Sequence, residues 1–297
     1  MNVLRNSVMQ QPCQHPLAVC VGLFIAMALS GCGAIVSNVS NGLAEDLSSA
    51  ILNQDDPELV REALPAYLLV LDSVVSSNPD DSGTLSAAAQ LYTAYGAVLV
   101  EDASRAKKLT ARARDYGNRA LCSSAPAACE LDGIDFDTYS SIIISLDEDD
   151  ADALYSYSLA NLAWIRTHSD NYSALADLPK IELALEHLMI IDPGDMGAGT
   201  SMYLGILKML RPAALGGDPE AGKYWFERGI VLSQGRDLSI KVEYARHYAR
   251  QMYDRELHDR LLNEVLRSEV RYPNLLLFNL LAQEQALILL DTANDYF

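Results

Sequence analysis

Basic residues are scarce in this sequence, with 22 Lys and Arg against 40 Asp and Glu and a formal net charge of −18. Proteins that bind nucleic acid gather Lys and Arg to displace counterions from phosphates, and segments that dock on anionic lipid are polybasic. The composition therefore argues against both classes. The length of 297 residues and a hydrophobic content of 50% instead suit one or two domains with a large core.

Residues for metal binding and catalysis are also few, with five histidines in the chain. His247 and His258 fall in neighbouring predicted helices, but no H-E-x-x-H or comparable ligand spacing occurs. The acidic run Asp147–Asp152 lacks the glycine and the final Glu of a calcium loop. No Gly-x-Ser-x-Gly nucleophile elbow is present. We therefore expect no enzyme, no metal site and no cofactor.

The stretch LGGDPEAGKY, residues 215–224, resembles a nucleotide-binding P-loop but lacks what the loop needs. Tyr224 stands where a Ser or Thr would bind magnesium, and Pro219 has no N–H to offer a phosphate. A helix start explains the same residues better, with Asp218 as N-cap, Pro219 in the first position and Glu220 at the positive end of the helix dipole. The pattern predicts a helix beginning here and no ATP site.

The N-terminal residues have the features of an export signal. Arg5 gives a positive charge, and the apolar run Leu17–Leu29 is too short to span a bilayer as a helix. This run ends in LSGC, which resembles the bacterial lipobox and implies cleavage before Cys32 and diacylation of its sulfur. Two or more acyl chains hold a protein stably on a membrane. An ordinary secretory signal with a chance cysteine is the alternative.

These features predict three regions and a compartment. We expect a lipoprotein signal peptide at 1–31, a lipidated tether at 32–55 and an all-helical domain at 56–297. Gly33 after the lipidated cysteine favours the outer over the inner membrane. The protein is thus expected to be periplasmic and anchored by lipid to a bacterial membrane.

Two cysteines of the expected domain form a candidate disulfide. Cys122 and Cys129 are separated by six residues, a spacing that suits a disulfide in an oxidising periplasm. Closing so short a loop adds roughly 2.5 kcal/mol in the chain-entropy model. A metal site would need further Cys or His ligands, and the flanks offer none.

From Pro57 onward the hydrophobic spacing is helical, and it predicts about eleven helices. The β-prone run Ser140–Ser145 is too short to argue for a strand. YLLVLDSVVSSNP and IELALEHLMIIDP both place a helix before Asn-Pro or Asp-Pro, as at the end of a tetratricopeptide (TPR) unit. We therefore predict an all-α, TPR-like solenoid of helical hairpins with a concave face or an internal channel.

Two groups of side chains are candidates for more than packing. Arg246 and Arg250 share a helix face, either as surface ion pairs or as inner-surface arginines suited to a carboxylate ligand. Aromatic residues on helices rich in small residues suit core packing, and a subset of them could line an apolar pocket. These aromatic residues are Tyr92, Tyr95, Tyr155, Tyr157, Trp164, Tyr203 and Trp225.

Five segments carry a resemblance to a known family: DDPELVREALPAYLLVLDSVV, LYTAYGAVLVEDASRAKKLTARARDYGNRALC, LANLAWIRTHSDNYSAL, LGGDPEAGKYWFERGIVLSQGRDL and YARHYARQMYDRELHDRLLNEVL. In their order and spacing they resemble the TatT family of TPR-like lipoproteins associated with TRAP (tripartite ATP-independent periplasmic) transporters. The resemblance covers roughly Asp55 to Phe297. It implies a trimer, an internal cleft in each subunit, and association with the transporter's solute-binding protein.

The resemblance also implies a ligand, either hydrophobic or an organic acid, that passes to or from that binding protein. Its motifs give six candidates for the ligand cleft: Tyr95, Arg105, Arg114, Trp164, Arg250 and Asp254. The alternative function is a scaffold or assembly lipoprotein of the cell envelope that binds protein partners only.

Overall fold

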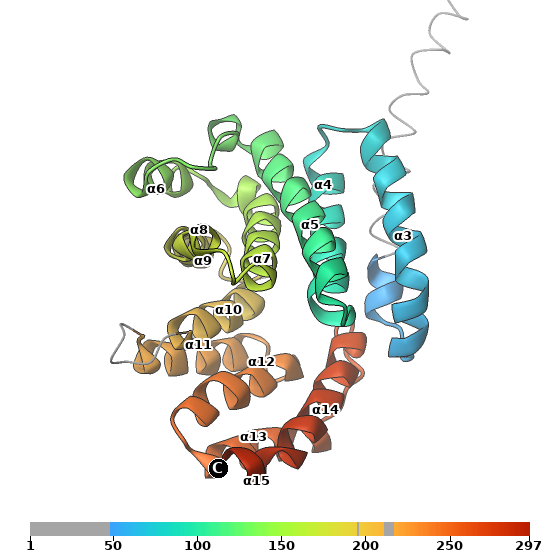
Figure 1. Ribbon diagram of the computed structural model, residues 1–297, viewed down its shortest axis with the longest axis vertical. Helices are drawn as coiled ribbons and strands as arrows, with labels where there is room; N and C mark the ends of the chain where they lie inside the picture. Colours follow the sequence, from blue (N-terminus) through green and yellow to red (C-terminus); the bar gives the residue numbers. More distant parts are fainter. Residues whose placement is uncertain (1–47, 195, 211–216) are drawn as a thin grey trace, which may run out of the picture. The chain divides into compact units, whose positions relative to one another are not determined.

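Every regular element that the structure describes is helical, as the sequence predicts. The computed structural model (Figure 1) describes residues 48–194, 196–210 and 217–297, which lie within one unit, Ala44–Phe297. The predicted signal peptide, the lipobox with Cys32 and most of the tether lie outside these residues. None of the helices in the described ranges is both long and apolar enough to cross a bilayer.

Thirteen α-helices, two π-helical segments and two 3-10 turns make up the described part. The α-helices are α3 (Pro57–Ser77), α4 (Ser82–Ala94), α5 (Ala103–Ser124), α6 (Phe136–Ile144), α7 (Ala151–Thr167), α8 (Tyr172–Ala176), α9 (Leu178–Ile191), α10 (Gly197–Met209), α11 (Pro219–Leu232), α12 (Leu238–Glu243), α13 (Arg255–Arg267), α14 (Leu276–Asp291) and α15 (Ala293–Tyr296). The π-helical segments are η1 (Tyr95–Leu99) and η5 (Tyr244–Ala249), and the 3-10 turns are η2 (Pro126–Ala128) and η3 (Glu148–Asp150).

Aspartates begin many of these helices. An N-cap carboxylate accepts hydrogen bonds from backbone N–H groups that have no partner in the first helical turn. The aspartates in this role are Asp56, Asp81, Asp102, Asp135, Asp218, Asp237 and Asp254. Part of the chain's acidity is therefore used to define where helices start.

The P-loop-like stretch is one of these helix starts, as predicted. The Asp218 carboxylate accepts from the Ala221 N–H at 3.0 Å, and Pro219 is the first residue of α11. Glu220 lies in the first turn. Gly216 and the residues just before it lie outside the described ranges.

The β-prone run Ser140–Ser145 belongs mostly to α6. Asp135 caps this helix, and its side chain accepts from Thr138 through both the backbone N–H and the hydroxyl. Tyr139 and Ile143 follow at a spacing of four residues and are fully buried. The cap and the buried face together outweigh the local β-propensity.

Helices that are neighbours in the sequence are mostly neighbours in space (Figure 1), as in a stack of helical hairpins. Helices α3 and α9 end where the Asn-Pro and Asp-Pro pairs predict, with Asn78 and Asp192 as C-caps. α5 and α7 approach each other closely, and Gly117 leaves room for the opposite backbone. A Cβ at this position would lie 3.1 Å from the Cα of Tyr157.

The first helices are held together by a buried polar contact. The hydroxyl of Tyr116 donates to the Asp72 carboxylate at 2.7 Å, and that of Tyr92 donates to the same carboxylate at 3.0 Å. Arg112 pairs with Asp72 at 3.0 Å. One carboxylate on α3 thus joins α4 and α5.

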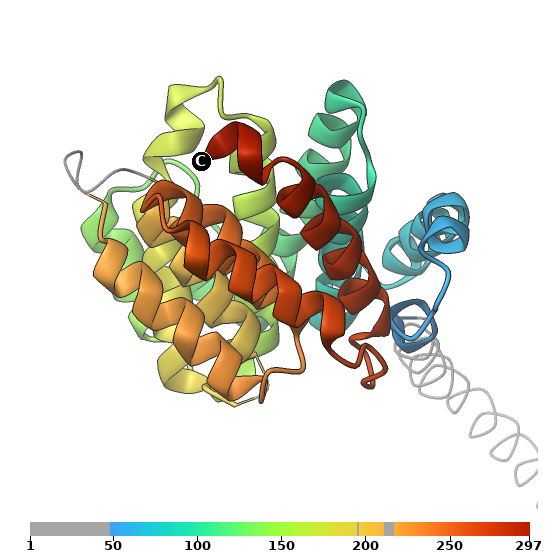
Figure 2. The ribbon, with the colours of Figure 1, turned by 90° about the horizontal axis from the view of Figure 1, so that it is seen from below.

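The last long helix returns to the first. α14 packs against α3, and Asn53 and Asn274 hydrogen bond each other where the residues just before α3 meet the turn just before α14. Arg271 pairs with Asp55 at 3.3 Å beside them. Figure 2 shows the red segment before α14 next to the blue start of the described chain. The helices of this unit therefore close into a ring rather than ending as an open array.

Buried side chains form two cores, and α10 and α14 contribute to both. Leu204 and Leu277 belong to the core of the N-terminal helices, whereas Met209 and Ala286 belong to that of the C-terminal helices. Residues 48–55, expected to be the end of the tether, also pack here, since Ile51 is buried in the first core.

Cys122 and Cys129 form a disulfide in the structure, with their Cα atoms 4.3 Å apart. The bond joins the last turn of α5 to the residue after η2. It fixes the turn that leads from α5 to α6.

Candidate functional site

The two π-helical segments flank a group of polar side chains on the inner side of the ring. A π turn leaves backbone carbonyls without their usual partners and often occurs at functional sites. In η1 the Val100 N–H bonds the carbonyl of Tyr95 at 3.1 Å, and the carbonyl of Ala97 accepts from the guanidinium of Arg166 instead. The irregular turn thereby holds an arginine from the end of α7.

Glu243, the last residue of α12, is the centre of the charged contacts. It pairs with Arg246 at 3.0 Å and with His247 at 3.1 Å, and its side chain is 21% exposed. Burial alone raises the pKa of this carboxyl, but the bond from His247 and the charges of Arg246 and Arg166 outweigh it and lower the pKa. Arg246 also donates to Gln285 of α14 at 2.8 Å.

Two tyrosines contribute hydroxyls without partners. Neither Tyr155 of α7 nor Tyr203 of α10 makes a hydrogen bond through its hydroxyl within the described part of the chain, and both are partly exposed. Burial, with a smaller contribution from Glu243, raises the pKa of Tyr203 to about 12. Burial also raises the pKa of Tyr155, whose hydroxyl lies against Gly199.

Two carboxylates near Tyr155 have no cation beside them in the described structure. Burial raises the pKa of Asp237, the N-cap of α12, although its carboxylate accepts from the Ser239 N–H at 3.0 Å. Burial likewise raises the pKa of Asp152, which accepts from Gln90 at 3.2 Å. Both carboxylates act electrostatically on Tyr155.

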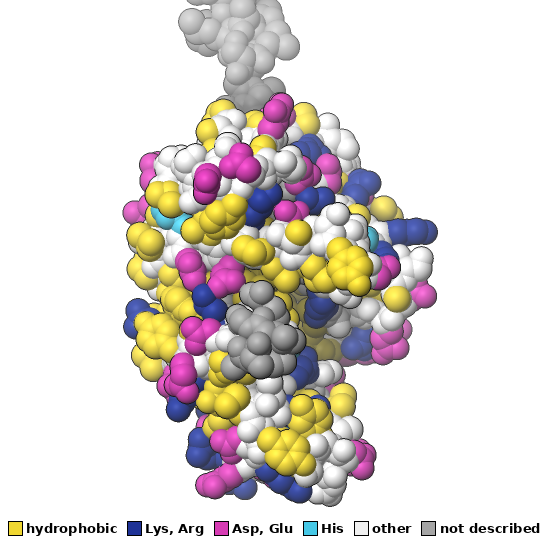
Figure 3. Space-filling model, turned by 60° about the vertical axis from the view of Figure 1, so that its left-hand side comes forward, with side chains coloured by type: hydrophobic (Ala, Val, Ile, Leu, Met, Phe, Trp, Pro, Cys, Tyr) yellow, Lys and Arg dark blue, Asp and Glu magenta, His cyan; other side chains and the backbone are white. Residues whose placement is uncertain are grey.

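We name Tyr155, Arg166, Tyr203, Asp237 and Glu243 the inner cluster. Its members come from α7, α10 and α12, and they act on one another electrostatically across the ring. Each is desolvated or held by protein contacts but keeps some exposed surface. The face drawn in Figure 3 is hollowed near its middle, with hydrophobic and basic side chains around the hollow.

The six residues predicted for the cleft lie in separate places. Arg105 donates to the hydroxyl of Tyr95 at 2.9 Å at the junction of η1 and α5. Arg114 lies 4.3 Å above the ring of Trp164 and donates to Asp132 at 2.6 Å. The structure therefore brings together these two pairs, each between neighbouring helices.

The other two candidates lie in the C-terminal helices. Arg250 donates to the carbonyl of Leu289 at 3.1 Å and to Thr292 at 2.8 Å, so that it closes the end of α14. Asp254 caps α13 through the Leu257 N–H and lies at an outer hollow. Burial lowers the pKa of Arg250, and the charge of Arg246 lowers it further.

Some members of the inner cluster can be recognised as candidates from the sequence. Tyr155 and Tyr203 belong to the aromatic set considered for a pocket, and Glu243 to the residues available for ion pairs with the arginines. No sequence pattern marks Arg166 or Asp237 as a site residue. Arg166 is placed by its contact with η1, and Asp237 is placed by the return of the chain towards α7. Contacts between segments far apart in the sequence leave no periodic pattern in either segment.

The described residues include no cluster of His, Cys, Asp or Glu that could hold a metal ion. What they do form is a closed array of helical hairpins with polar groups on its inner side, an architecture of binding proteins. The chain matches the model of the family TAtT, the TRAP transporter T-component, over residues 53–297, and it belongs to that family. A search of curated proteins gave no match.

Family membership confirms the resemblance found in the sequence. The protein is a TRAP transporter component, and its family is one of transporter accessories rather than of enzymes. The matched range covers every helix from α3 onward and therefore includes the whole inner cluster.

Proposed function

We propose that this protein is a periplasmic, lipid-anchored accessory of a TRAP-type transport system. It binds the solute-binding protein of that system and holds a small ligand at the inner cluster. The family match supports the transporter association. Cys32 in its lipobox sequence supports the anchor, and with Gly33 after it the outer membrane is the expected location.

The observation that carries the ligand proposal is the pair of hydroxyls without partners, on Tyr155 and Tyr203. Small-molecule sites combine apolar walls with a few polar groups that fix orientation. The two phenol rings supply apolar surface, and their hydroxyls supply donors and acceptors. Arg166 adds a guanidinium whose one hydrogen bond in the described structure is to a carbonyl. The ligand is therefore a molecule with an apolar body and a carboxylate end.

The test uses the full lipid-anchored protein, extracted from its own membranes with mild detergent. Native mass spectrometry followed by denaturing extraction identifies what travels with it. We expect an organic acid with an apolar body, together with a TRAP solute-binding protein. A chain with no small molecule, bound to envelope assembly proteins alone, would establish the scaffold function instead.

Two variants connect the ligand to the site. Tyr203→Phe keeps the ring and removes the hydroxyl, and Arg166→Gln removes the charge; both should lower the amount of bound ligand. Arg228→Gln removes an exposed charge on α11 and should leave that amount unchanged. Equal occupancy in all three variants would place the ligand elsewhere.

A further inference from the structure

Helix α6 has one side packed and one side open to solvent. It packs against α9 and the turn η2, and Figure 1 shows it at an edge of the described unit. Its packed side buries Tyr139 and Ile143, whereas Phe136 is 46% exposed and Ile144 is 57% exposed. Two large apolar side chains therefore remain on the open side of this helix.

The neighbouring helix α9 contributes a third exposed apolar side chain. His187 of α9 is hydrogen bonded to the carbonyl oxygen of Leu146 at 3.0 Å, just beyond the end of α6. Ile190 follows one turn later on α9, and its side chain is 75% exposed. The open side of α6 together with Ile190 is called the α6 face below.

The charge around the α6 face is of one sign. Residues 120–150 contain eight Asp and Glu and no Lys, Arg or His. Within the described ranges, one of the eight has a basic partner: Asp132 pairs with Arg114 at 2.6 Å. The eight acidic residues are Glu130, Asp132, Asp135, Asp137, Asp147, Glu148, Asp149 and Asp150.

These carboxylates lie before and after the apolar side chains of α6. Asp135 and Asp137 stand on either side of Phe136 in the sequence, and the acidic residues 147–149 begin three positions after Ile144. Phe136 and Ile144 are eight residues apart, which is roughly 12 Å along a helix. The α6 face thus has an apolar middle and an acidic group at each end.

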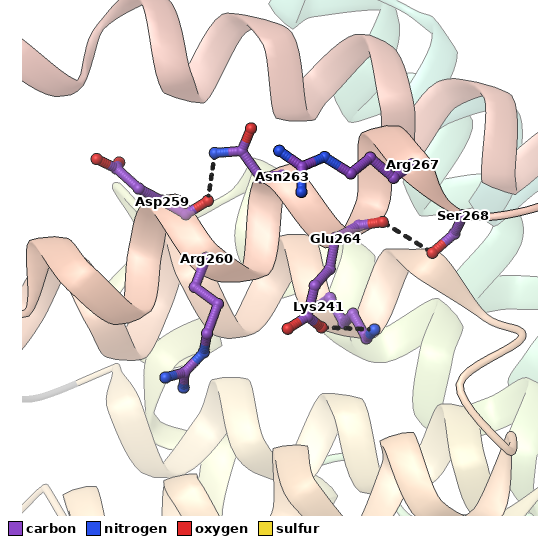
Figure 4. A pocket seen from close by; sticks show the side chains of 7 residues that line it. All are labelled: Lys241, Asp259, Arg260, Asn263, Glu264, Arg267 and Ser268. Carbon is purple, nitrogen blue, oxygen red and sulfur yellow. Dashed lines mark hydrogen bonds and ion pairs between the residues drawn. The ribbon is translucent and has the colours of Figure 1, made fainter.

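The hollow between α12 and α13 shows a different distribution of charge. Figure 4 shows acidic and basic side chains together there, and Lys241 pairs with Glu264 at 2.8 Å. Charge in that hollow selects neither an acidic nor a basic partner. The α6 face, by contrast, attracts a basic surface and repels an acidic one.

We propose that the α6 face is a docking surface for an amphipathic helix of a partner protein, with an apolar stripe flanked by Lys and Arg. Its apolar residues cover Phe136 and Ile144, as one helix packs on another. Its basic residues pair with the carboxylates at the two ends of α6. The same carboxylates disfavour an anionic lipid surface, which basic segments bind. The α6 face is separate from the inner cluster, so the proposal does not depend on a ligand there.

The probe is a labelled helical peptide with leucines along one side and lysines at both edges of that side. Its control has the same composition in a shuffled order that forms no stripe. Fluorescence anisotropy is measured with the full-length protein in mild detergent, and detergent alone gives the background. Binding of the striped peptide should weaken between about 20 and about 200 mM salt. The shuffled peptide should bind more weakly at each salt concentration.

Charge-matched variants test the acidic ends. Asp137→Asn with Glu148→Gln removes two carboxylates that are not N-caps and should weaken binding about fivefold. Glu62→Gln with Glu101→Gln removes two exposed carboxylates elsewhere and should change affinity by less than about twofold.

A second pair of variants tests the apolar middle. Ile144→Ser should weaken binding about tenfold, because the exposed part of this side chain is buried in the complex. Leu69→Ser on α3, where the side chain is 70% exposed, is the matched control and should leave affinity unchanged. Tyr203→Phe in the inner cluster should also leave it unchanged. Circular dichroism checks that each variant is folded.

Three results would overturn the proposal. Equal weakening in the two charge variants would mean attraction by net charge alone. An effect of the acidic residues without any effect of Ile144→Ser would mean that the apolar side chains are not covered. Equal binding of the striped and shuffled peptides, or no binding at low salt, would exclude a docked amphipathic helix.

Discussion

Asn53 and Asn274 bind each other through side chain and backbone at once. The Asn53 amide donates to the Asn274 side-chain oxygen at 2.9 Å, and the Asn274 N–H donates to the Asn53 oxygen at 2.8 Å. Asn274 has a φ of 61°, a conformation that asparagine adopts more readily than most residues. This contact joins the residues before α3 to the turn before α14 and so closes the helical ring.

Asn53→Ala should therefore weaken the contact between the residues before α3 and the turn before α14. We expect the free energy of unfolding to fall by about 1 kcal/mol, since the exposed amide makes net hydrogen bonds of modest strength. The backbone amides of both α3 and α14 should exchange with deuterium faster in this variant than in the native protein. Gln54→Ala is the control, because Gln54 bonds only the neighbouring Asp55 N–H. Faster exchange in α3 alone would show that Asn53 does not hold α14.

Much of the fold follows from local patterns in the sequence. The N-cap of α11 at Asp218 and the end of α3 at Asn78 could be predicted, because caps and breakers act within a few residues. The family and the all-α class could be recognised for the same reason: each motif is a short helical segment with its own periodicity. The helix over Phe136–Ile144 follows from the cap at Asp135 together with the buried face of Tyr139 and Ile143.

The candidate site depends on contacts that no short segment encodes. Arg166 reaches Ala97 across 69 residues, and the electrostatic effect of Glu243 on Tyr203 spans 40. The motifs that contain the six predicted cleft residues do not specify which helix faces meet. Residue type singles out arginines and tyrosines as groups, but the ring closure decides which of them converge.

The approach of α5 to α7 makes Gly117 sensitive to substitution. In Gly117→Ala the new Cβ would lie 3.1 Å from the Cα of Tyr157 and 3.2 Å from the Ser156 carbonyl oxygen, both of them backbone atoms. The helices must therefore separate, at a cost of about 1–3 kcal/mol of unfolding free energy in urea denaturation.

Gly83→Ala provides the matched control for that substitution. Its Cβ would meet only the Asp81 carboxylate, at 3.9 Å, in the first turn of α4. Alanine should stabilise the protein there by up to about 1 kcal/mol. If both substitutions shift the urea midpoint in the same direction, steric contact between α5 and α7 is not the cause.

The Cys122–Cys129 bond should contribute to stability through its short loop. Replacing both cysteines with serine is expected to lower the free energy of unfolding by about 2.5 kcal/mol. A reducing agent should lower the native protein's stability by a similar amount and leave the double variant unchanged. If the reductant does not change the stability of the native protein and its thiols react with a labelling reagent, Cys122 and Cys129 are reduced in that protein. The predicted disulfide would then be absent.

Glu243 should make the inner cluster sensitive to acid. Its pKa in the folded protein is lowered, since the bond from His247 and the charges of Arg246 and Arg166 outweigh the effect of burial. A carboxyl with a lowered folded pKa adds stability above its unfolded pKa, about 4.3, and this stability is lost as pH falls through the lower folded value.

Glu243→Gln should accordingly destabilise the protein at neutral pH and have little effect in acid. We expect a deficit of about 1–2 kcal/mol at neutral pH, from the loss of the contacts with Arg246 and His247. That deficit should shrink below a pH of about 4.3, because the native carboxyl then becomes protonated as well. Glu62→Gln, on the exposed side of α3, should show no deficit at any pH. A deficit for Glu243→Gln that stays constant with pH would mean that packing, rather than charge, holds the residue in the inner cluster.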